Sequence, residues 1–358
     1  MTRIQPQPGI LGITPYVGGK GAPTAQANSV KLSSNENPHG ASPRARDAYR
    51  AMSGNLHIYP SGDHRDLRAA IGSVHDVDPD RIVCGSGSDE ILALLCNAYT
   101  GPGTQIVQTA HAFAMYAIYA RAAGAEVVSV PENARHADVD ALLAAVTDTT
   151  RLVFLANPNN PTGTMIPDAD VAHLAEALPD SCLLVLDGAY AEYVPGHDGY
   201  LGLAAQHDHV FVTRTFSKIH GLGALRVGWG IGTPEVIGVL NRIRGPFNVT
   251  APALSAAQAA IEHTDYVDRC RDDNTRWRDW LVGELHALGL ACDPMHGNFV
   301  VPRFADAAAA QAADAALAEA GLIVRQVGGY GLPEALRITV GKGADCKRVI
   351  AVLKEHLA

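Results

Sequence analysis

The stretch Leu183-Leu184-Val185-Leu186-Asp187-Gly188-Ala189-Tyr190 places four consecutive apolar residues before an acidic residue and a glycine. A short apolar run that stops at such a break is typical of a strand covered on both faces. A carboxylate at the end of that run, Asp187, is at least partly buried, so it must pair with a cation or take part in chemistry. The stretch therefore predicts a buried strand with a functional group at its carboxyl end.

Similar apolar runs occur along the chain and alternate with segments of helical length. The other predicted strands are Ile82–Cys84, Gln105–Thr109, Glu126–Val130, Leu152–Ala156, Val210–Thr213 and Val227–Ile231. The predicted helices between them include Asp89–Tyr99, Met115–Ala123, Asp138–Val146 and Asp168–Ala177. This alternation predicts an α/β fold in which a mostly parallel, seven-stranded sheet lies between helices.

The pattern changes after about residue 250, where longer helices and shorter strands predict a smaller α+β domain. The helices are Ala253–Glu262, Tyr266–Ala287 and Asp306–Ala320, and the strands are Phe299–Val301 and Leu336–Val340. Residues 1–30 are rich in proline and glycine, which indicates an extended arm. We therefore expect an N-terminal arm at 1–30, a large domain at 31–250 and a small domain at 251–358 that packs with the N-terminal segment.

Composition narrows the class of protein. The 358 residues carry a formal net charge of −9, and no run of Lys or Arg could follow a phosphate backbone, so a nucleic-acid partner is not expected. No apolar run approaches the roughly 18–20 residues of a membrane span, and residues 1–22 lack the apolar core of a signal peptide. The six cysteines are scattered without metal-type spacing. We therefore expect a cytoplasmic protein with free thiols and no metal site.

Ligands of open α/β sheets bind at the carboxyl ends of the strands, so we expect functional residues just after the predicted strands. After Ile82–Cys84 comes Gly85-Ser86-Gly87-Ser88-Asp89-Glu90, followed by a helix. Glycines allow a close approach of the backbone, and the N–H groups of a helix N-terminus bind anions. The segment is equally compatible with a phosphate cradle and with a simple helix cap, and it is not a complete G-x-G-x-x-G motif.

Two further loops follow strands. Asn157-Pro158-Asn159-Asn160-Pro161-Thr162-Gly163 is a rigid turn in which the amide of Asn160 suits a hydrogen bond to a ring oxygen, although an ordinary loop would read the same. After Val210–Thr213 come Thr215, Ser217 and Lys218, with Arg226 eight residues later. Hydroxyls, an amine and an arginine in that order predict a phosphate site beside a reactive amine.

These residue types match the needs of transamination. The reaction requires an amine that forms a Schiff base with an aldehyde cofactor and later acts as a base, for which Lys218 is the candidate. It requires a carboxylate opposite a pyridine nitrogen, for which Asp187 is the candidate. It also requires a phosphate anchor, for which the candidates are Ser88, Thr215, Ser217 and Arg226. The sequence therefore predicts an enzyme that uses pyridoxal 5′-phosphate.

The chain resembles the fold-type I pyridoxal-phosphate aminotransferases of the histidinol-phosphate aminotransferase group. The resemblance is carried by Leu32–Pro38, Tyr59–Gly62, Gly85–Glu90, Asn157–Gly163, Arg214–Lys218, Gly221–Trp229, Arg244–Val249 and Leu336–Gly341. It runs almost the full length of the chain, and its motifs are more specific for fold and cofactor than for substrate.

The resemblance implies roles for individual residues. Lys218 would bind the cofactor, Asp187 would face the pyridinium nitrogen, and Asn160 and Tyr190 would bond the ring hydroxyl. Phe113 would stack on the ring, and the backbone at Ser88 and Asp89 would help to hold the phosphate, together with Thr215, Ser217 and Arg226. Tyr190 is also a catalytic candidate beside Lys218 and Asp187.

The resemblance also implies a homodimer and a substrate-binding end. Tyr59 would reach the cofactor phosphate of the neighbouring subunit. Arg337 would bind the acid group of the substrate, and Arg325, Tyr16 and Asn35 would lie near it. Both arginines are alternatively surface ion-pair residues.

The chain departs from the family pattern at two places. Gly188 replaces a usual glutamate that does not contact the cofactor, so we expect activity to survive. His111 and Phe113 stand where the family usually has proline and tyrosine, which could alter the substrate pocket, although His111 also fits a plain loop residue.

The leading hypothesis is amino-group transfer between glutamate and imidazole-acetol phosphate, which gives histidinol phosphate in histidine synthesis. A close alternative is an aromatic amino-acid aminotransferase that acts on phenylalanine or tyrosine. Less favoured alternatives are a phospho-amino-acid decarboxylase on the same scaffold and a homologue that binds without catalysis.

Overall fold

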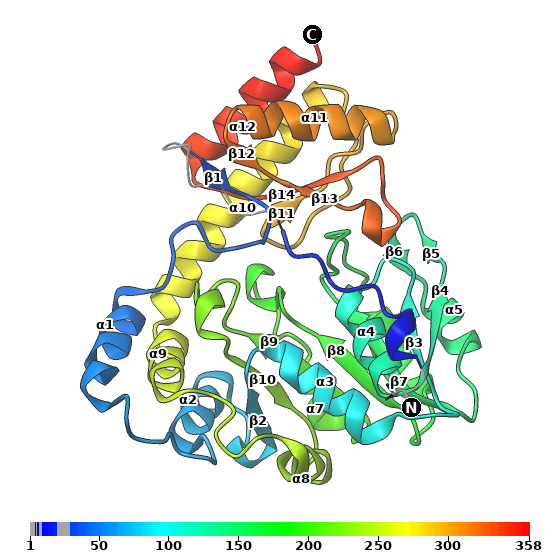
Figure 1. The fold of residues 1–358 in the computed structure, drawn as a ribbon, viewed down its shortest axis with the longest axis vertical. Coiled ribbons are helices and arrows are strands. Elements are labelled where there is room, and N and C mark those ends of the chain that lie inside the picture. The colour runs from blue at the N-terminus through cyan, green and yellow to red at the C-terminus, as the bar shows by residue number, and fades with distance from the viewer. Residues whose placement is uncertain (1–3, 5, 7–8, 20–28) are drawn as a thin grey trace.

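The computed structural model describes residues 4, 6, 9–19 and 29–358. These residues form two bodies, one built around a seven-stranded sheet and the other around a three-stranded sheet (Figure 1). We refer to them as the large-sheet body and the small-sheet body. The arm predicted for residues 1–30 lies partly outside the described residues.

The large sheet contains all seven strands expected from the sequence. They are β2 (Ile82–Gly85), β3 (Gln105–Thr109), β4 (Glu126–Val130), β7 (Thr150–Ala156), β8 (Leu183–Asp187), β9 (Val210–Thr215) and β10 (Gly228–Ile231). Their order is β2-β10-β9-β8-β7-β3-β4, and only β10 runs antiparallel to its neighbours. The predicted α/β fold with a mostly parallel seven-stranded sheet is therefore confirmed.

Helices cover both faces of this sheet (Figure 1). One face packs against α1 (Pro43–Ala51), α2 (Arg65–His75), α5 (Val139–Ala144), α6 (Asp168–Ala177), α7 (Leu201–Gln206) and α9 (Ala251–Ile261). The other packs against α3 (Ser88–Tyr99), α4 (Ala114–Ala122) and α8 (Pro234–Ile243). Successive strand residues alternate between the two cores, as when Leu184 and Leu186 join one and Val185 joins the other.

Side-chain caps fix where several helices begin. The hydroxyls of Ser42 and Thr233 accept backbone N–H groups at the start of α1 and α8, and a proline follows each cap. A capping oxygen satisfies an N–H that has no partner inside the helix, and proline suits the first helical position.

The small-sheet body holds β11 (Phe299–Val300), β13 (Arg325–Gln326) and β14 (Leu336–Thr339) in the antiparallel order β11-β14-β13. Its helices are α10 (Thr264–Ala287), α11 (Ala307–Glu319) and α12 (Gly343–His356). Near the N-terminus, β1 (Val30–Lys31) pairs in parallel with β12 (Leu322–Ile323). A short hairpin, β5 (Glu132–Asn133) with β6 (His136–Ala137), projects from the large-sheet body toward the small one (Figure 1).

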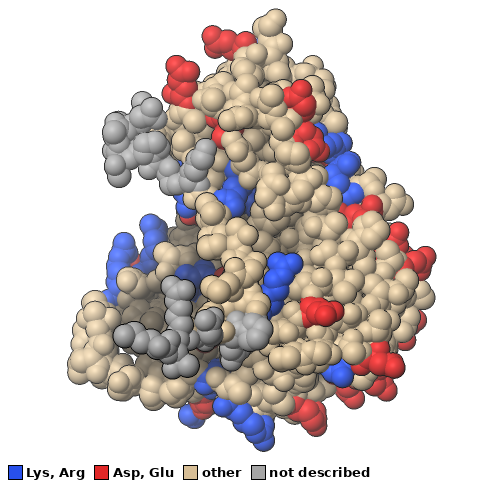
Figure 2. Space-filling model, turned by 45° about the vertical axis from the view of Figure 1, so that its right-hand side comes forward, with Lys and Arg blue, Asp and Glu red and all other residues tan. Residues whose placement is uncertain are grey.

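Basic and acidic side chains are interspersed on the face shown in Figure 2, with wide uncharged areas between them. Within the described part of the chain, no helix is both long and apolar enough to cross a membrane.

Candidate active site

A cavity lies at the carboxyl ends of β7, β8 and β9, beside the N-terminus of α3. It is lined by Ser88, Asp89, Phe113, Asn160, Asp187, Tyr190, Thr215, Ser217, Lys218 and Arg226, and also by Tyr116, Ala156, Pro158 and Ala189. The first ten are the cofactor-binding candidates of the sequence, apart from Tyr59. The structure thus brings together side chains that are up to 138 positions apart, from Ser88 to Arg226.

Asp187 ends β8 at the buried wall of the cavity, with only 6% of its surface exposed. Its Oδ2 accepts the hydroxyl proton of Tyr116 at 2.6 Å, and its Oδ1 accepts the N–H of Ala189 and the hydroxyl of Thr213. Burial raises the pKa of Asp187, and these uncharged donors oppose that rise. The carboxylate is therefore fixed in orientation, and the donors that hold it carry no positive charge.

Lys218 follows β9 and is partly buried. Its Nζ donates to the carbonyl of Ser34 at 3.3 Å and lies 5.8 Å from the ring centre of Tyr190. Burial, followed by the positive charge of Arg337, lowers the pKa of the Lys218 amine to about 8. The uncharged fraction of this amine near neutral pH is therefore far larger than for an ordinary lysine, and the uncharged form can act as a nucleophile or base.

Arg226 lies at the end of the cavity formed by the start of α3. Its guanidinium donates to Asp89 Oδ2 at 2.8 Å and to Ser217 Oγ at 3.2 Å, and Thr215 Oγ1 accepts the N–H of Ser217. Gly87, with φ of +81°, precedes the helix, and a Cβ atom there would lie 2.4 Å from Nη2 of Arg226. The positive φ favours glycine at this position, and hydroxyls, helix N–H groups and a guanidinium lie together at this end of the cavity.

Tyr190 also lines the cavity and is anchored by the N-terminal segment. Its hydroxyl accepts Nδ2 of Asn35 at 2.8 Å. Asn35 is buried, has φ of +55°, and exchanges hydrogen bonds with the hydroxyl of Thr339 in β14. Asn35, predicted as a substrate contact, is thus placed as a link between Tyr190 and the small sheet.

Arg337 in β14 extends from the small-sheet body to Asn160, a lining residue of the cavity, and is not itself among the lining residues. Its Nη1 donates to Oδ1 of Asn160, and its Nη2 donates to the carbonyl of Ser33 at 2.9 Å. The residue is 6% exposed and its Nε has no hydrogen-bond partner within the described structure. Arg337 is therefore a buried cation with an unsatisfied donor, which excludes a surface ion-pair role.

The other predicted substrate residues lie near Arg337. Arg325 donates to the carbonyl of Val17 at 2.6 Å and lies over the ring of Tyr16, and Tyr16 is 47% exposed. Burial, followed by Tyr16, raises the pKa of Tyr330 to about 12, which places this further phenol in the same group.

Tyr59 does not line the cavity of its own chain. Its ring is 77% exposed and stacks on Phe247 at a centroid distance of 4.7 Å. It borders a second surface hollow that shares Arg226 with the cavity.

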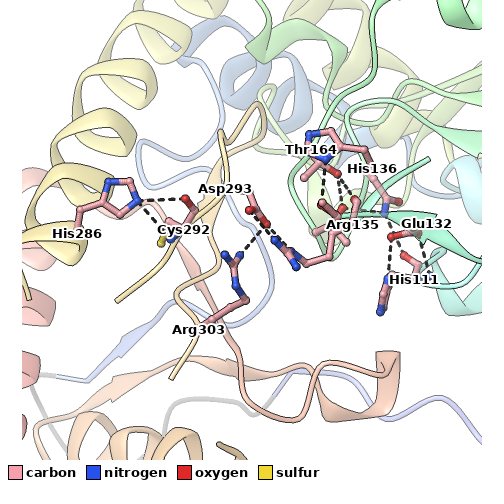
Figure 3. A network of polar contacts seen from close by, with 12 residues as sticks. His111, Glu132, Arg135, His136, Thr164, His286, Cys292, Asp293 and Arg303 are labelled. Atoms are coloured by element: carbon pink, nitrogen blue, oxygen red, sulfur yellow. Dashed lines mark hydrogen bonds and ion pairs between the residues drawn. The ribbon is translucent and has the colours of Figure 1, made fainter. Parts of the chain in front are cut away.

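Both departures from the family pattern have a structural context. A Cβ atom on Gly188 would lie 2.9 Å from Cδ of Arg214, so Arg214 occupies the space next to that position. His111 does not line the cavity, and its Nδ1 lies 2.7 Å from Oε2 of the buried Glu132 (Figure 3).

Sequence reasoning gave no role to Tyr116. This residue is fully buried, stacks on Phe154 at 4.6 Å and holds Asp187. The available signal was its position three residues after Phe113, because that spacing puts both rings on one side of a helix at a strand end.

Comparison with known proteins agrees with this geometry. The family model described as aminotransferase class I and II matches residues 27–353. The chain belongs to this family. This aminotransferase is similar to a protein from Ruegeria pomeroyi that is named histidinol-phosphate aminotransferase. The two are 57% identical over 99% of this chain and 98% of the relative. The enzyme of the same name from Paracoccus denitrificans is 53% identical over 100% of this chain and 97% of its own.

This aminotransferase is also similar in fold to a solved structure. The crystal structure of histidinol-phosphate aminotransferase from Sinorhizobium meliloti in complex with pyridoxal-5′-phosphate superposes with a TM-score of 0.91. Its sequence is 28% identical, and the match covers 100% of this chain and 98% of that one.

Proposed function

We propose that this protein is a pyridoxal-phosphate-dependent transaminase that interconverts imidazole-acetol phosphate plus glutamate with histidinol phosphate plus 2-oxoglutarate, a step of histidine biosynthesis. The observation that carries the proposal is the convergence of Lys218, Asp187 and Arg226 on one cavity. The names of the relatives above, at 53–57% identity over nearly the full length, support the choice of substrate.

The residues of the cavity fit the cofactor. Asp187 is a buried carboxylate whose pKa is raised by burial and whose donors are uncharged, so a cationic ring nitrogen would offset its desolvation. At the other end Arg226, Ser217 and the first N–H groups of α3 suit a phosphate. Phe113 also lines the cavity. When bound, pyridoxal phosphate supplies an aldehyde that exchanges amines and a ring that accepts electrons from the substrate.

The chain's own groups then hold and move protons. Lys218 Nζ, with a pKa of about 8, supplies an uncharged amine and accepts a proton from the substrate carbon. Asp187, whose Oδ2 is oriented by the hydrogen bond from Tyr116, would favour a proton on a ring nitrogen of the cofactor through its negative charge. Tyr190 and Asn160 line the same cavity and are proposed to bond the ring hydroxyl.

The acid group of the substrate is proposed to bind Arg337. The bonds to Asn160 and Ser33 use one N–H on each Nη atom, and Nε has no partner, so this buried guanidinium keeps N–H donors for an anion. Arg325, Tyr16 and Tyr330 would extend the anion site toward the N-terminal segment, which suits a substrate that carries a phosphate.

We further propose a homodimer in which Tyr59 reaches the cofactor phosphate of the partner subunit. Leu56, Ile58 and Tyr59 are 70%, 56% and 77% exposed, and an apolar cluster of this kind is typical of a protein interface. A cytoplasmic location is proposed from the six free cysteines. The division into 1–30, 31–250 and 251–358 stays a prediction; α9 packs in the core of the large-sheet body.

A panel of amino donors, each assayed with 2-oxoglutarate as the amino acceptor, tests the function. We expect kcat/KM in the reverse direction to be far higher for histidinol phosphate than for phenylalanine or tyrosine. A strong preference for phenylalanine would replace the proposal with an aromatic aminotransferase. Release of carbon dioxide without any dependence on glutamate would replace it with a decarboxylase.

A further inference from the structure

The turn of the β5–β6 hairpin has an unusual conformation. Ala134 and Arg135 form its two-residue loop, with φ values of +47° and +66°. Two left-handed residues in succession fit a type I′ turn, which strongly favours Asn-Gly because other side chains are strained there. Such strain persists where surrounding contacts hold it in place, and Arg135 makes contacts of this kind.

Those contacts cross from one body to the other. Arg135 donates from Nε to Asp293 Oδ2 at 2.6 Å and from Nη2 to Asp293 Oδ1 at 2.8 Å. Asp293 belongs to the small-sheet body, and Arg303 of the same body donates to its Oδ2 at 2.7 Å. Figure 3 shows both guanidinium groups directed at this one carboxylate. A planar two-point pair between partly buried groups fixes orientation as well as distance.

The hairpin is also bonded to two segments of the large-sheet body that lie next to lining residues of the cavity. Glu132 accepts the N–H of His111 at 3.0 Å and its Nδ1 at 2.7 Å, two residues before Phe113 (Figure 3). The hydroxyl of Thr164 donates to the carbonyl of Arg135 at 2.7 Å, and the carbonyl of Thr164 accepts the N–H of Asn159. Movement of the hairpin would therefore move the loop that carries Asn160.

On the other side, Asp293 lies close to the segment that meets this same loop. The N–H of His296 donates to the carbonyl of Gly163 at 3.0 Å, and a Cβ atom on Gly163 would lie 2.5 Å from Sδ of Met295. The chain then enters β11, which pairs with β14, where Arg337 reaches Asn160. The ion pair is thus a contact between the two bodies, and it lies next to the loop whose Asn160 is bonded by Arg337.

We propose that Arg135 is a positioning residue: by its two-point pair with Asp293 it holds the small-sheet body so that Arg337 stands at the substrate end of the cavity. This inference rests on the proposed function for its kinetic consequence. It requires that loss of the pair weaken binding of substrates through their acid group, while the chemical step and cofactor binding continue.

The test compares Arg135→Gln with Arg303→Gln, because both remove a guanidinium from the same carboxylate but only Arg135 spans the two bodies. We expect Arg135→Gln to raise KM for glutamate roughly tenfold, with kcat and pyridoxal-phosphate affinity changed less than about twofold. Asp293→Asn should behave alike, and the double variant should add no further rise. Arg303→Gln should lower Tm and leave KM unchanged. Arg135→Lys, which keeps the charge and loses the second bond, should give an intermediate KM.

Hydrogen exchange on the substrate-free protein gives a readout independent of the reaction. We expect Arg135→Gln to increase exchange in 157–164 and 291–299, and Arg303→Gln to spare 157–164. If exchange is faster in Arg135→Gln but the unaltered protein turns over no amino donor, the proposed function is contradicted and the positioning role stands. An unchanged KM in Arg135→Gln, or an equal rise in Arg303→Gln, would overturn the positioning role.

Discussion

Tyr116 connects the packing of the large-sheet body to the chemistry of the cavity. Its hydroxyl donates to Oδ2 of Asp187, while its ring stacks on Phe154 and meets Phe113 edge-on at 5.7 Å. Phenylalanine at position 116 would keep the ring contacts and lose only the hydrogen bond. The contribution of that bond to the carboxylate can therefore be isolated.

We predict that Tyr116→Phe weakens pyridoxal-phosphate binding and lowers kcat about tenfold, because losing one charge-assisted bond of about 1.5 kcal/mol or more lets Asp187 turn. Fluorescence titration of the cofactor-free protein and steady-state kinetics measure both effects. Tyr99→Phe, in α3 and outside the cavity lining, is the matched control and should change neither. Wild-type values in Tyr116→Phe would show that Thr213 and Ala189 suffice to hold the carboxylate.

The pKa of Lys218 sets a pH dependence. Folding lowers this pKa from 10.5 to about 8, so the amine loses its proton as pH rises through 8. We predict that the rate of pyridoxal-phosphate uptake by the cofactor-free protein rises about tenfold per pH unit below 8 and levels off above it. Stopped-flow absorbance measures this rate.

The same shift has a consequence for stability. Between pH 8 and 10.5 the unfolded chain binds the proton that the folded chain has released, so this group's contribution to stability increases with pH in that window. Arg337→Gln should move the inflection of the uptake rate upward, because Arg337 is one cause of the shift. An inflection near 10 in the unaltered protein would contradict the assignment.

At the scale of elements, Arg214 occupies the space beside the turn that follows β8, which leaves little room there for a side chain larger than that of glycine. This arginine donates to Glu192 and to the carbonyl of Asp198 and is 2% exposed. Its Cδ would lie 2.9 Å from a Cβ atom on Gly188. The glutamate that the family usually has at this position therefore has no room in this chain.

We predict that Gly188→Ala lowers the free energy of unfolding by about 1–3 kcal/mol, the usual cost of adding a methyl group where buried atoms cannot yield. Chemical denaturation measures the change. The control is Gly283→Ala within the exposed side of α10, where a Cβ atom meets nothing within 4 Å. That change should stabilise the protein by about 0.5–1 kcal/mol, as alanine does in helices. A neutral Gly188→Ala would mean that Arg214 moves easily.

The sequence predicts the helices and strands better than it predicts which residues of different elements come into contact. The seven strands of the large sheet follow from apolar runs, and the position of Asp187 at a buried strand end follows from the same pattern. Helix α12 was missed, although its buried residues Cys346, Val349, Ile350 and Leu353 have the i, i+3, i+4, i+7 spacing that indicates an amphipathic helix. The contact of Arg337 with Asn160 joins positions 177 apart, and local spacing carries no information on such a pair.

At the scale of the whole molecule, the site is proposed to need two chains. Tyr59 is exposed and lies outside the cavity of its own chain, whereas Lys218 lines it. A dimer of one Lys218→Ala chain and one Tyr59→Ala chain would contain one intact site and one doubly altered site.

We predict that mixing these two inactive or weakened variants under conditions of subunit exchange restores activity. Steady-state assays of the mixture, against each variant alone, measure the effect. Two preparations of Lys218→Ala mixed together are the control and should stay inactive. Absence of any gain, once exchange is verified by differently tagged chains, would contradict the shared site.

The pairing of β1 with β12 joins residues 30–31 to residues 322–323. During synthesis, β1 therefore has no partner strand until about nine-tenths of the chain has been made. Until then its backbone groups and the Leu32 side chain that follows are open to other molecules. A chain cut short before residue 322 leaves this end permanently exposed, so nonsense and truncation products should be removed by chaperones and proteases rather than persist as partial enzymes.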